Sequence, residues 1–207
     1  MARDRGRLIA LEGVDGCGKS TQAGMLADRI GALLTREPGG TATGRMVRSI
    51  VLDSEGSLDS RAEALLMVAD RAQHCAEVIE PALAGGRWVV TDRFAASTFA
   101  YQGFGRGLEL AELETISAWA ARSLVPDLYV LIDVPLEVAS ARRSSQGDRM
   151  ESEPSDFHDR VARGFAEQAA SDPAGWAVID GNAPVEEVAE RVYRAVVEKT
   201  GLPARVR

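Results

Sequence analysis

The segment from Gly13 to Ser20 contains residues whose types and spacing could bind phosphate groups. It matches the pattern G-x-x-x-x-G-K-S/T and lies between a short apolar run and a stretch with helical spacing. Glycines allow consecutive backbone N–H groups to turn toward phosphate oxygens, and the following helix adds positive potential at its N-terminus. In such a loop Lys19 reaches the β- and γ-phosphates, and the hydroxyl of Ser20 binds Mg²⁺. The pattern predicts a site for a nucleoside triphosphate.

The lysine content of the chain supports this interpretation. Of the 24 basic residues, only Lys19 and Lys199 are lysines, and the others are arginines. The compact ammonium group of lysine and the planar guanidinium of arginine are not interchangeable at a tightly packed phosphate site. A chain that otherwise uses arginine, but keeps lysine at position 19, indicates that the loop needs this side chain.

Three arginines could bind a second anionic substrate. Arg36 and Arg93 directly follow or end apolar, strand-like runs, and Arg48 lies on the expected helix after Arg36. The forked guanidinium group fits phosphate oxygens in a bidentate manner. Arginines at strand ends beside a phosphate-binding loop favour a nucleoside monophosphate as second substrate. Each arginine alone could equally be a solvated charge or part of a surface ion pair.

The expected secondary structure brings these residues to one edge of a parallel sheet. Apolar runs typical of buried strands alternate with stretches of helical spacing, which favours an α/β fold with helices on both faces of the sheet. In such a sheet ligands bind at the carboxyl ends of the strands, where Glu12, Asp92 and Asp133 also lie. The expected strands are 7–12, 33–35, 87–92, 127–133 and 176–180, and the expected helices include 19–30, 41–52, 60–83, 110–120, 135–143 and 184–198.

Three local patterns complete this prediction. Ser60 and Glu63 have the spacing of a capping box at the start of a helix. Pro81 predicts that the same helix ends or kinks near that residue. The glycines and aromatic residues of 101–107 predict a loop.

Composition argues against several other classes of protein. A length of 207 residues predicts one domain, and an apolar fraction of 45% is enough for a core. The net charge of −7 argues against binding nucleic acid or an anionic membrane by bulk electrostatics. The longest apolar run, 64–69, is too short to span a bilayer, and Leu8–Leu11 is too short for a signal-peptide core. Since two cysteines are too few for a disulfide framework or a zinc site, we expect a soluble cytoplasmic protein.

Beyond the phosphate-binding loop, the chain resembles thymidylate kinase of the bacterial type over nearly its whole length. The segments 36–40 (REPGG) and 100–103 (AYQG) are typical of that family among P-loop kinases, and further matches are 69–74 (ADRAQH), 91–94 (TDRF), 126–127 (PD) and 148–153 (DRMESE). The resemblance implies a single domain over 1–207 with a P-loop kinase fold, five parallel strands and a mobile lid at about 142–155. It also implies transfer of the γ-phosphoryl group of ATP to dTMP, giving dTDP and ADP for dTTP biosynthesis, with Mg²⁺ as cofactor and a homodimeric enzyme.

The resemblance implies roles for individual residues as well. Asp15 would accept a hydrogen bond from the 3′-hydroxyl of the deoxyribose, Arg71 would bind the thymine ring, and Asp92 would help Ser20 to place Mg²⁺. The dTMP site would consist of Asp15, Arg36, Arg48, Met67, Arg71, Arg93, Ser97, Tyr101 and Gln102. The ATP site would consist of Gly13, Val14, Asp15, Gly16, Cys17, Gly18, Lys19, Ser20, Thr21, Arg142 and Arg143.

Arginines would neutralise the charge of the transferring phosphate. Arg36 and Arg93 would bind the acceptor phosphate, with assistance from Arg48. Family members without an arginine inside the P-loop supply the remaining charge from the lid, and this chain has Gly16 at that place. Arg149 is therefore the predicted catalytic residue of the lid. The predicted catalytic residues are Lys19, Arg93, Arg149 and Asp15.

One position departs from the family pattern. Where the family usually has a phenylalanine that stacks on thymine, this chain has Met67. A thioether contacts the face of a base more loosely than an aromatic ring does. The missing aromatic contact could come from Phe94, Phe99 or Tyr101.

Three further side chains are expected to take no part in the chemistry. An acceptor phosphate is already anionic at neutral pH, so that phosphoryl transfer to it needs no general base. His74 and His158 are therefore expected to be solvated histidines on helices. Cys17 is expected to fill space in the loop rather than to act as a reactive thiol.

Two other functions remain open on sequence alone. A P-loop nucleoside kinase would phosphorylate a sugar hydroxyl with a carboxylate base such as Asp15 or Asp92, but a neutral nucleoside would leave Arg36 and Arg93 without a phosphate to bind. A nucleotide-hydrolysing switch is the second alternative. A GTPase of that kind usually has an Asn-Lys-x-Asp segment, and the chain contains none.

Overall fold

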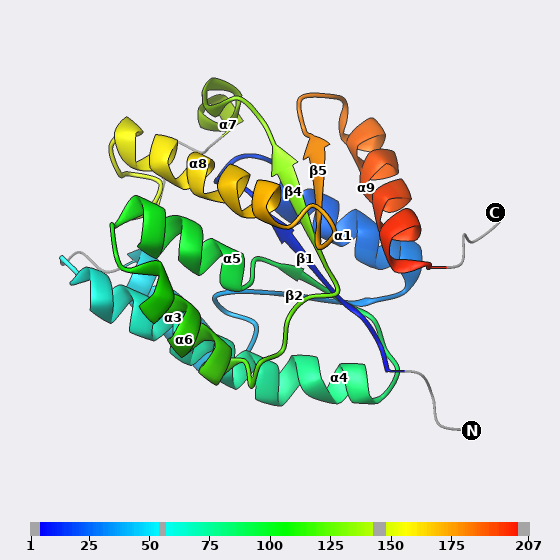
Figure 1. Cartoon of the computed structure of the whole chain (residues 1–207), viewed down its shortest axis with the longest axis horizontal. Coiled ribbons are helices and arrows are strands. Elements are labelled where there is room, and N and C mark those ends of the chain that lie inside the picture. Colours follow the sequence, from blue (N-terminus) through cyan, green and yellow to red (C-terminus); the bar gives the residue numbers. More distant parts are fainter. Residues whose placement is uncertain (1–4, 54–56, 143–147, 203–207) are drawn as a thin grey trace.

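Five strands form one sheet at the centre of the computed structural model (Figure 1). The structure describes residues 5–53, 57–142 and 148–202. Each neighbouring pair of strands is parallel, and the spatial order is β2-β3-β1-β4-β5. This confirms the predicted five-stranded parallel sheet. The strands are β1 (Leu8–Glu12), β2 (Leu33–Arg36), β3 (Val89–Asp92), β4 (Leu128–Asp133) and β5 (Trp176–Asp180).

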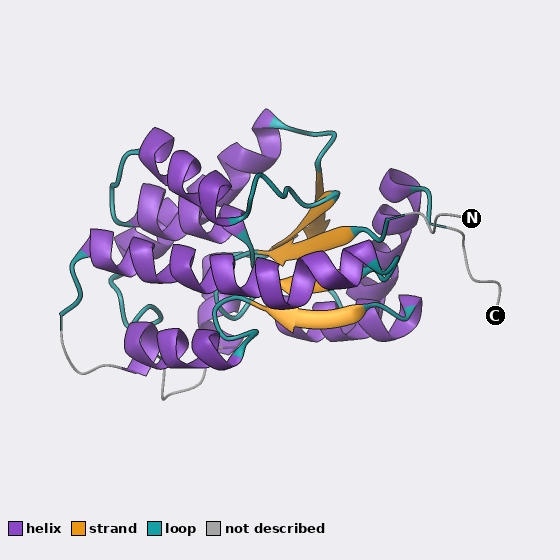
Figure 2. Ribbon diagram, turned by 90° about the horizontal axis from the view of Figure 1, so that it is seen from below, coloured by secondary structure: helices purple, strands orange, loops and turns teal. Residues whose placement is uncertain are grey.

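Helices cover both faces of the sheet (Figure 2). Along β1 the side chains alternate: Leu8 and Ala10 pack with the helical run 60–84, whereas Ile9 and Leu11 belong to the core cluster that includes the helix after the P-loop. The α-helices are α1 (Lys19–Ile30), α2 (Ala42–Arg48), α3 (Ser60–His74), α4 (Glu80–Ala84), α5 (Ala95–Thr98), α6 (Leu110–Ala120), α7 (Leu136–Arg142), α8 (Ser155–Ser171) and α9 (Val185–Thr200). Three π-helical segments are η1 (Ser49–Asp53), η2 (Cys75–Ile79) and η3 (Phe99–Gly105).

The carboxyl ends of all five strands lie at one edge of the sheet, because every pair is parallel. Each strand ends in a charged residue, and the register places the Cα atom of Arg36 opposite that of Asp92. After β1 the chain forms β2 and β3 on one side of β1. It then forms β4 and β5 on the other side of β1. The P-loop therefore begins where the direction of winding reverses, which is where open α/β sheets bind ligands.

The helix that begins at Ser60 differs from its prediction at the N-terminus. The cap is Asp59, whose carboxylate accepts a hydrogen bond from the N–H of Arg61 at 2.9 Å. Glu63 does not form the predicted capping box with Ser60, because it is fully buried and binds side chains of other elements instead. The helical run continues through η2 and α4, and it ends at Ala84, three residues after Pro81, as the proline predicts.

The predicted loop at 101–107 is wrong over most of its length. Residues up to Gly105 continue α5 as the π-helical segment η3. The glycines in this segment serve close packing: a Cβ atom at Gly103 would lie 2.4 Å from a methyl carbon of Leu110, and one at Gly105 would lie 2.6 Å from the ring of Phe157. Glycine-rich composition indicates here a crowded helix rather than a turn.

No helix within the described residues is both long and apolar enough to cross a membrane.

Candidate active site

The P-loop connects β1 to α1 through left-handed backbone conformations that only glycine adopts easily. Gly13, Gly16 and Gly18 have φ angles of 140°, 86° and 97°. A Cβ atom at Gly13 would also lie 2.7 Å from the carbonyl oxygen of Ile132. Gly18 is the N-cap of α1 and provides no capping side chain, so the N–H groups of the first helical turn stay available to an anion.

A cavity of about 410 Å³ lies over the start of α1 and is called the P-loop cavity below. Arg142 lines it, and both Nη atoms of Arg142 donate to the carbonyl oxygen of Gly181 at 3.3 and 3.4 Å. Of the predicted ATP site, Arg143 lies outside the described residues. The lining consists of Gly16, Cys17, Gly18, Lys19, Ser20, Thr21, Gln22, Arg142, Gly181, Ala183, Val185 and Val188.

Residues predicted to hold a metal ion lie side by side next to this cavity. The hydroxyl of Ser20 donates a hydrogen bond to Oδ2 of Asp92. The other carboxylate oxygen of Asp92, Oδ1, is buried and has no hydrogen-bond partner among the described residues. A hydroxyl and an unpartnered carboxylate oxygen are hard oxygen donors of the kind that Mg²⁺ prefers. The residues present therefore fit this ion.

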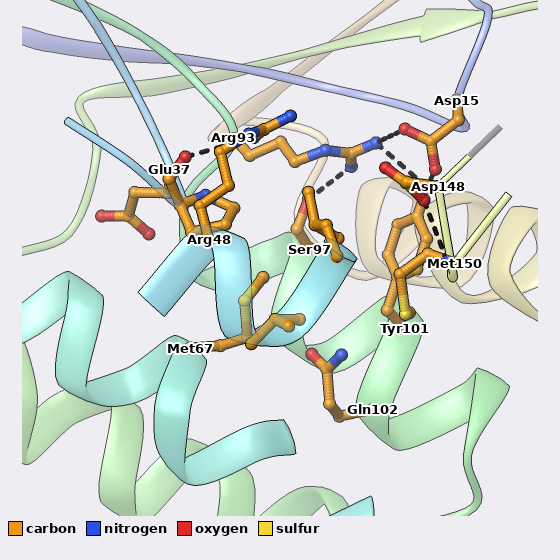
Figure 3. A pocket seen from close by; sticks show the side chains of 13 residues that line it. Asp15, Glu37, Arg48, Met67, Arg93, Ser97, Tyr101, Gln102, Asp148 and Met150 are labelled. Atoms are coloured by element: carbon orange, nitrogen blue, oxygen red, sulfur yellow. Dashed lines mark hydrogen bonds and ion pairs between the residues drawn. The ribbon is translucent and has the colours of Figure 1, made fainter. Parts of the chain in front are cut away.

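A second cavity, called the arginine cavity below, lies on the other side of Asp15 and encloses only about 70 Å³. Figure 3 shows the guanidinium of Arg93 between Asp15 and Ser97, with Met67 and Gln102 toward the opposite side of the view. Seven of the nine predicted dTMP-site residues line it, and Arg36 and Arg71 do not. The full lining consists of Asp15, Glu37, Pro38, Arg48, Val51, Leu52, Met67, Arg93, Ser97, Tyr101, Gln102, Asp148 and Met150.

Asp15 joins the two cavities through short contacts to cations from both sides. Its Oδ1 accepts hydrogen bonds from Arg93 at 2.6 Å and from the ammonium group of Lys19 at 3.4 Å, and its Oδ2 accepts one from the hydroxyl of Tyr101 at 2.6 Å. Burial alone would raise the pKa of Asp15, but the charges of Arg93 and Lys19 outweigh it and hold the pKa far below its usual range. Asp15 is therefore an ionised hydrogen-bond acceptor at neutral pH.

Arg93 has a backbone conformation that is uncommon for a residue with a side chain, with φ of 75°. Hydrogen bonds fix the chain on both sides: the N–H of Arg93 donates to the carbonyl of Leu11 at 2.9 Å, and the N–H of Phe94 donates to Glu12 at 2.8 Å. The side chain extends into the cavity, where Nη1 donates to Ser97 at 2.8 Å. Such strain persists only where the surrounding structure holds it, and it is common at functional sites.

Glu12 positions Arg93 indirectly, through the hydroxyl of Ser97. Its carboxylate is fully buried at the end of β1 and accepts hydrogen bonds from the N–H of Phe94 and, at 2.6 Å, from the hydroxyl of Ser97. The hydroxyl of Ser97 thus donates to Glu12 and accepts from Arg93, so that Ser97 positions the arginine in addition to lining the cavity. Burial raises the pKa of Glu12 from 4.5 to about 7, although Arg93 and both hydrogen bonds oppose this shift.

Arg71, predicted to bind the base, lies behind the wall of the arginine cavity. It is 1% exposed and donates to Glu37 at 2.9 Å, to Thr98 at 3.0 Å and to Ser117 at 3.4 Å. These three bonds use one N–H of each guanidinium nitrogen and leave one N–H on each Nη group for contact with a base. That contact stays a prediction.

The two histidines are buried, contrary to the expectation of solvated side chains. His74 bridges the hydroxyl of Thr35 at 2.6 Å and the carboxylate of Glu37 at 2.9 Å. His158 is 7% exposed and contacts the ring of Phe157 edge-on. His74 is buried because the carboxylate of Glu37, the buried second residue of the REPGG segment, needs polar partners.

The remaining predicted arginines differ in their placement. Arg48 lines the arginine cavity and donates to the carbonyl of Pro38 at 3.2 Å. Arg36 is exposed and does not line that cavity, although its strand end lies beside Asp92. Its predicted contact with an acceptor phosphate stays a prediction.

Arg149, the predicted catalytic residue of the lid, bonds to α3 and η1 rather than to the P-loop among the described residues, and its catalytic role stays a prediction. Its guanidinium forms an ion pair with Glu63 of α3 and donates to the carbonyl of Val51 at 2.8 Å. The backbone of the same segment is fixed by a hydrogen bond from Arg149 to Leu52 at 3.2 Å. The physical reason is the buried carboxylate of Glu63, which would be costly to leave without positive partners.

The side chains named as substitutes for the stacking aromatic fall into two groups. Tyr101 lines the arginine cavity, but its hydroxyl is bound to Asp15. Phe94 and Phe99 do not line it, and Phe94 is buried in the core beneath Arg71. Met67, which replaces the stacking aromatic of the family, is half-buried on α3 and lines the cavity.

Cys17 behaves as expected of a residue that fills space. It is 2% exposed, and burial raises the pKa of its thiol despite the nearby charge of Lys19. A thiol with a raised pKa is a poor nucleophile at neutral pH.

Sequence reasoning missed the carboxylates behind the arginines and one wall of the P-loop cavity. Glu37 and Glu63 bind arginines in the interior. In the sequence, Glu37 belongs to the REPGG segment and Glu63 to the predicted capping box, and neither pattern indicates an internal ion pair. Gly181 and Ala183 line the P-loop cavity directly after β5. The rule that ligands bind at carboxyl ends of strands could have found this last segment.

The fold and the loop after β1 define the class of P-loop kinases. A family model described as thymidylate kinase matches residues 11–192. The chain is 46% identical over 190 residues to the thymidylate kinase of Cupriavidus metallidurans, covering 89% of this chain and 94% of that protein, and 45% identical over 203 residues to that of Desulfovibrio desulfuricans, covering 91% and 94%. The crystal structure of thymidylate kinase from Ehrlichia chaffeensis superposes with a TM-score of 0.78 at 30% identity, covering 93% of this chain and 98% of that one. The chain belongs to the thymidylate kinase family.

The raised pKa of Glu12 predicts a specific pH dependence of stability. Between pH 4.5 and about 7 the folded protein holds a proton on Glu12 that the unfolded chain releases, so this residue makes stability fall as the pH rises through that window. Relative to Glu12→Gln, the wild type should lose on the order of 3 kcal/mol of unfolding free energy across it. Urea unfolding of both proteins from pH 4.5 to 8 measures the difference, and a constant difference would contradict the prediction.

Proposed function

We propose that the chain is a nucleoside monophosphate kinase that transfers the γ-phosphoryl group of ATP to dTMP, giving dTDP and ADP. One observation carries this proposal: the chain of contacts from Lys19 through Asp15 to Arg93 links the P-loop cavity to the arginine cavity. A donor phosphate at Lys19 and an acceptor phosphate at Arg93 would lie on either side of one carboxylate. This arrangement suits transfer between two bound nucleotides better than hydrolysis of one.

The reaction needs positioning and charge neutralisation rather than a base. The acceptor phosphate is already anionic and attacks directly, while fixed positive groups stabilise the added charge in a site shielded from water. Lys19 binds the donor phosphates, and Arg93 binds the acceptor phosphate with Arg48 assisting. Arg93 suits this role because its Nε–H and one Nη1–H make no bond to the described residues.

Asp15 binds the sugar. An ionised carboxylate offers about four acceptor positions, and three of those on Asp15 are used by Arg93, Lys19 and Tyr101. The position left on Oδ2 accepts the 3′-hydroxyl of the deoxyribose. Because the pKa of Asp15 lies far below its usual range, this carboxylate is a poor general base, which disfavours a nucleoside kinase that would use Asp15 to deprotonate a hydroxyl.

Mg²⁺ would be held by the hydroxyl of Ser20 and the carboxylate of Asp92, whose Oδ1 has no partner among the described residues. The ion supplies neutralisation of phosphate charge. Arg142, held by the carbonyl of Gly181, contributes positive charge to the ATP side of the P-loop cavity. The catalytic role proposed for Arg149 requires its guanidinium to exchange Glu63 for a phosphate.

We also propose a cytoplasmic homodimer. Both cysteines are free and buried, which suits a reducing compartment. Between α3 and α6 lies an apolar groove of about 580 Å³, bordered by Arg61 of α3 and Glu112 of α6. The exposed fractions of Leu65 beside it and of Trp119 on α6 are 59% and 81%. We place the two-fold axis of the dimer through this surface, where Arg61 and Glu112 supply charges of opposite sign beside the apolar groove.

Steady-state ADP formation with and without dTMP tests the proposed reaction. We expect turnover to depend on dTMP, Lys19→Ala to abolish it while the circular dichroism spectrum is kept, and Arg93→Ala to raise the KM for dTMP by about 100-fold through lost charge-assisted hydrogen bonds. The KM for ATP serves as the control for Arg93→Ala. Equal turnover in the absence of any monophosphate, or a rise in the ATP KM alone, would contradict the proposal.

The methionine at position 67 predicts a gain from restoring a ring. Met67→Phe should lower the KM for dTMP about 3- to 10-fold, because an aromatic pair adds favourable energy beyond the area it buries. Met67→Leu is the matched control, since it keeps the apolar volume without a ring, and the KM for ATP should not change in either variant. A gain of the same size in both would show that ring stacking is not the cause.

The homodimer is tested by solution mass. Light scattering after size exclusion should give the mass of two chains for the wild type and of one chain for Leu65→Glu, because the substitution places two buried charges in an apolar interface. Val125→Glu is the matched control, because Val125 is also apolar and 66% exposed but lies in the loop before β4. A dimeric Leu65→Glu protein, or a monomeric wild type, would contradict this surface.

A further inference from the structure

The carboxylate of Glu63 bonds to side chains from η3 and from the segments around Arg106 and Arg149, next to the arginine cavity. It is fully buried on α3 and accepts hydrogen bonds from Gln102 at 2.9 Å and from Arg106 at 3.1 and 3.3 Å, in addition to the ion pair with Arg149. Burial would raise the pKa of Glu63, but the hydrogen bonds from Arg106, Gln102 and Arg149 outweigh it, so the net pKa is lowered. Glu63 is ionised at neutral pH and can only accept hydrogen bonds. The proposed mechanism gives it no role.

This acceptor determines which way the amide of Gln102 points. An amide has a donating nitrogen and an accepting oxygen, and only the nitrogen can bond to an ionised carboxylate. Nε2 of Gln102 therefore faces Glu63, and Oε1 is left without a partner among the described residues although it is buried. Gln102 is 1% exposed and lines the arginine cavity. A buried acceptor without a donor is costly, so this oxygen is the group of Gln102 that is placed to accept a hydrogen bond from a ligand.

We propose that Glu63 is a positioning residue for base selection, which holds the amide of Gln102 so that its oxygen accepts a hydrogen bond from an N–H group of the base. The inference rests on the proposed function and specifies what its acceptor site selects. Thymine and uracil carry N3–H, which donates to this oxygen. Neutral cytosine has a lone pair at N3 and would face it with a second acceptor. The site therefore selects bases with an imide N–H and rejects those with an amidine edge.

A purely structural role of Glu63 makes a different prediction. If Glu63 acted only by holding Arg106 and Arg149, its loss would affect all acceptor nucleotides alike. An effect on Arg149, including a faster or slower transfer step, is common to every acceptor and cancels in the ratio of two kcat/KM values. The ratio between two bases therefore reports on Gln102 alone.

The test is Glu63→Gln, with kcat/KM measured for dTMP, dUMP and dCMP. The new amide can donate as well as accept, so the amide of Gln102 becomes free to rotate. We expect the preference for dTMP over dCMP to fall roughly 10- to 100-fold, the value of one or two buried hydrogen bonds. The preference for dTMP over dUMP should stay unchanged, because both carry N3–H. Glu63→Asp keeps an acceptor-only group and should retain most of the preference over dCMP.

Arg106→Met is the matched control. It removes one cationic partner of Glu63 and leaves the bond between Glu63 and Gln102 intact, so the ratio of dTMP to dCMP should stay that of the wild type. An unchanged ratio in Glu63→Gln, or an equal loss in Arg106→Met, would overturn the inference.

The failure of the proposed function has a separate signature. If the wild type transferred phosphate to no monophosphate, the proposed function would fail, and calorimetric binding of dTMP and dCMP to wild type and Glu63→Gln would still decide the inference. If Glu63→Gln did not fold, as judged by circular dichroism, Gln102→Met would take its place. Retention of the preference for dTMP over dCMP in Gln102→Met would then overturn the inference.

Discussion

The contact of Asp15 with Lys19 on one side and Arg93 on the other is the interaction on which the site depends. Cations that serve two phosphates must lie close together, and without an anion between them they would repel one another in a poorly hydrated site. The carboxylate of Asp15 offsets this repulsion, and the two cations in turn keep it ionised. One residue of the P-loop thereby sets the spacing between donor and acceptor groups.

The same principle is repeated behind the other arginines of the site. Three buried carboxylates fix arginines of the site. Glu37 forms an ion pair with Arg71, and Glu63 forms one with Arg149. Glu12 acts indirectly, because it accepts a hydrogen bond from Ser97, which in turn bonds to Arg93. A buried guanidinium without such a partner would be too costly, and an arginine held on one edge keeps its other N–H groups for a ligand. The buried arginines around the site therefore need acidic partners in the interior.

The sequence was sufficient for the fold and for those site residues whose backbone position is fixed by a strand end. The parallel sheet with helices on both faces follows from the alternation of strands and helices. Asp92 ends a buried strand and Arg93 follows it, so their place at the sheet edge could be predicted. Arg149 and Glu63 could not be predicted in the same way. Their pairing joins positions 86 residues apart, and in sequence Glu63 has the spacing of a cap while Arg149 resembles a free loop charge. Only the burial of Glu63 decides between these readings.

The volume of the arginine cavity constrains how a nucleotide could enter. Ligand sites for small molecules typically measure about 300 to 1,000 Å³, whereas this cavity encloses about 70 Å³. Gln102 and Ser97 are fixed by buried hydrogen bonds, so moving either side chain would cost the free energy of a buried hydrogen bond. The opposite part of the lining contains Asp148 and Met150. Their segment is attached to η1 by the hydrogen bonds of Arg149 to Val51 and Leu52. If the acceptor nucleotide binds here as proposed, its entry would displace that segment and would couple occupancy of the site to the position of Arg149 and to the exclusion of water.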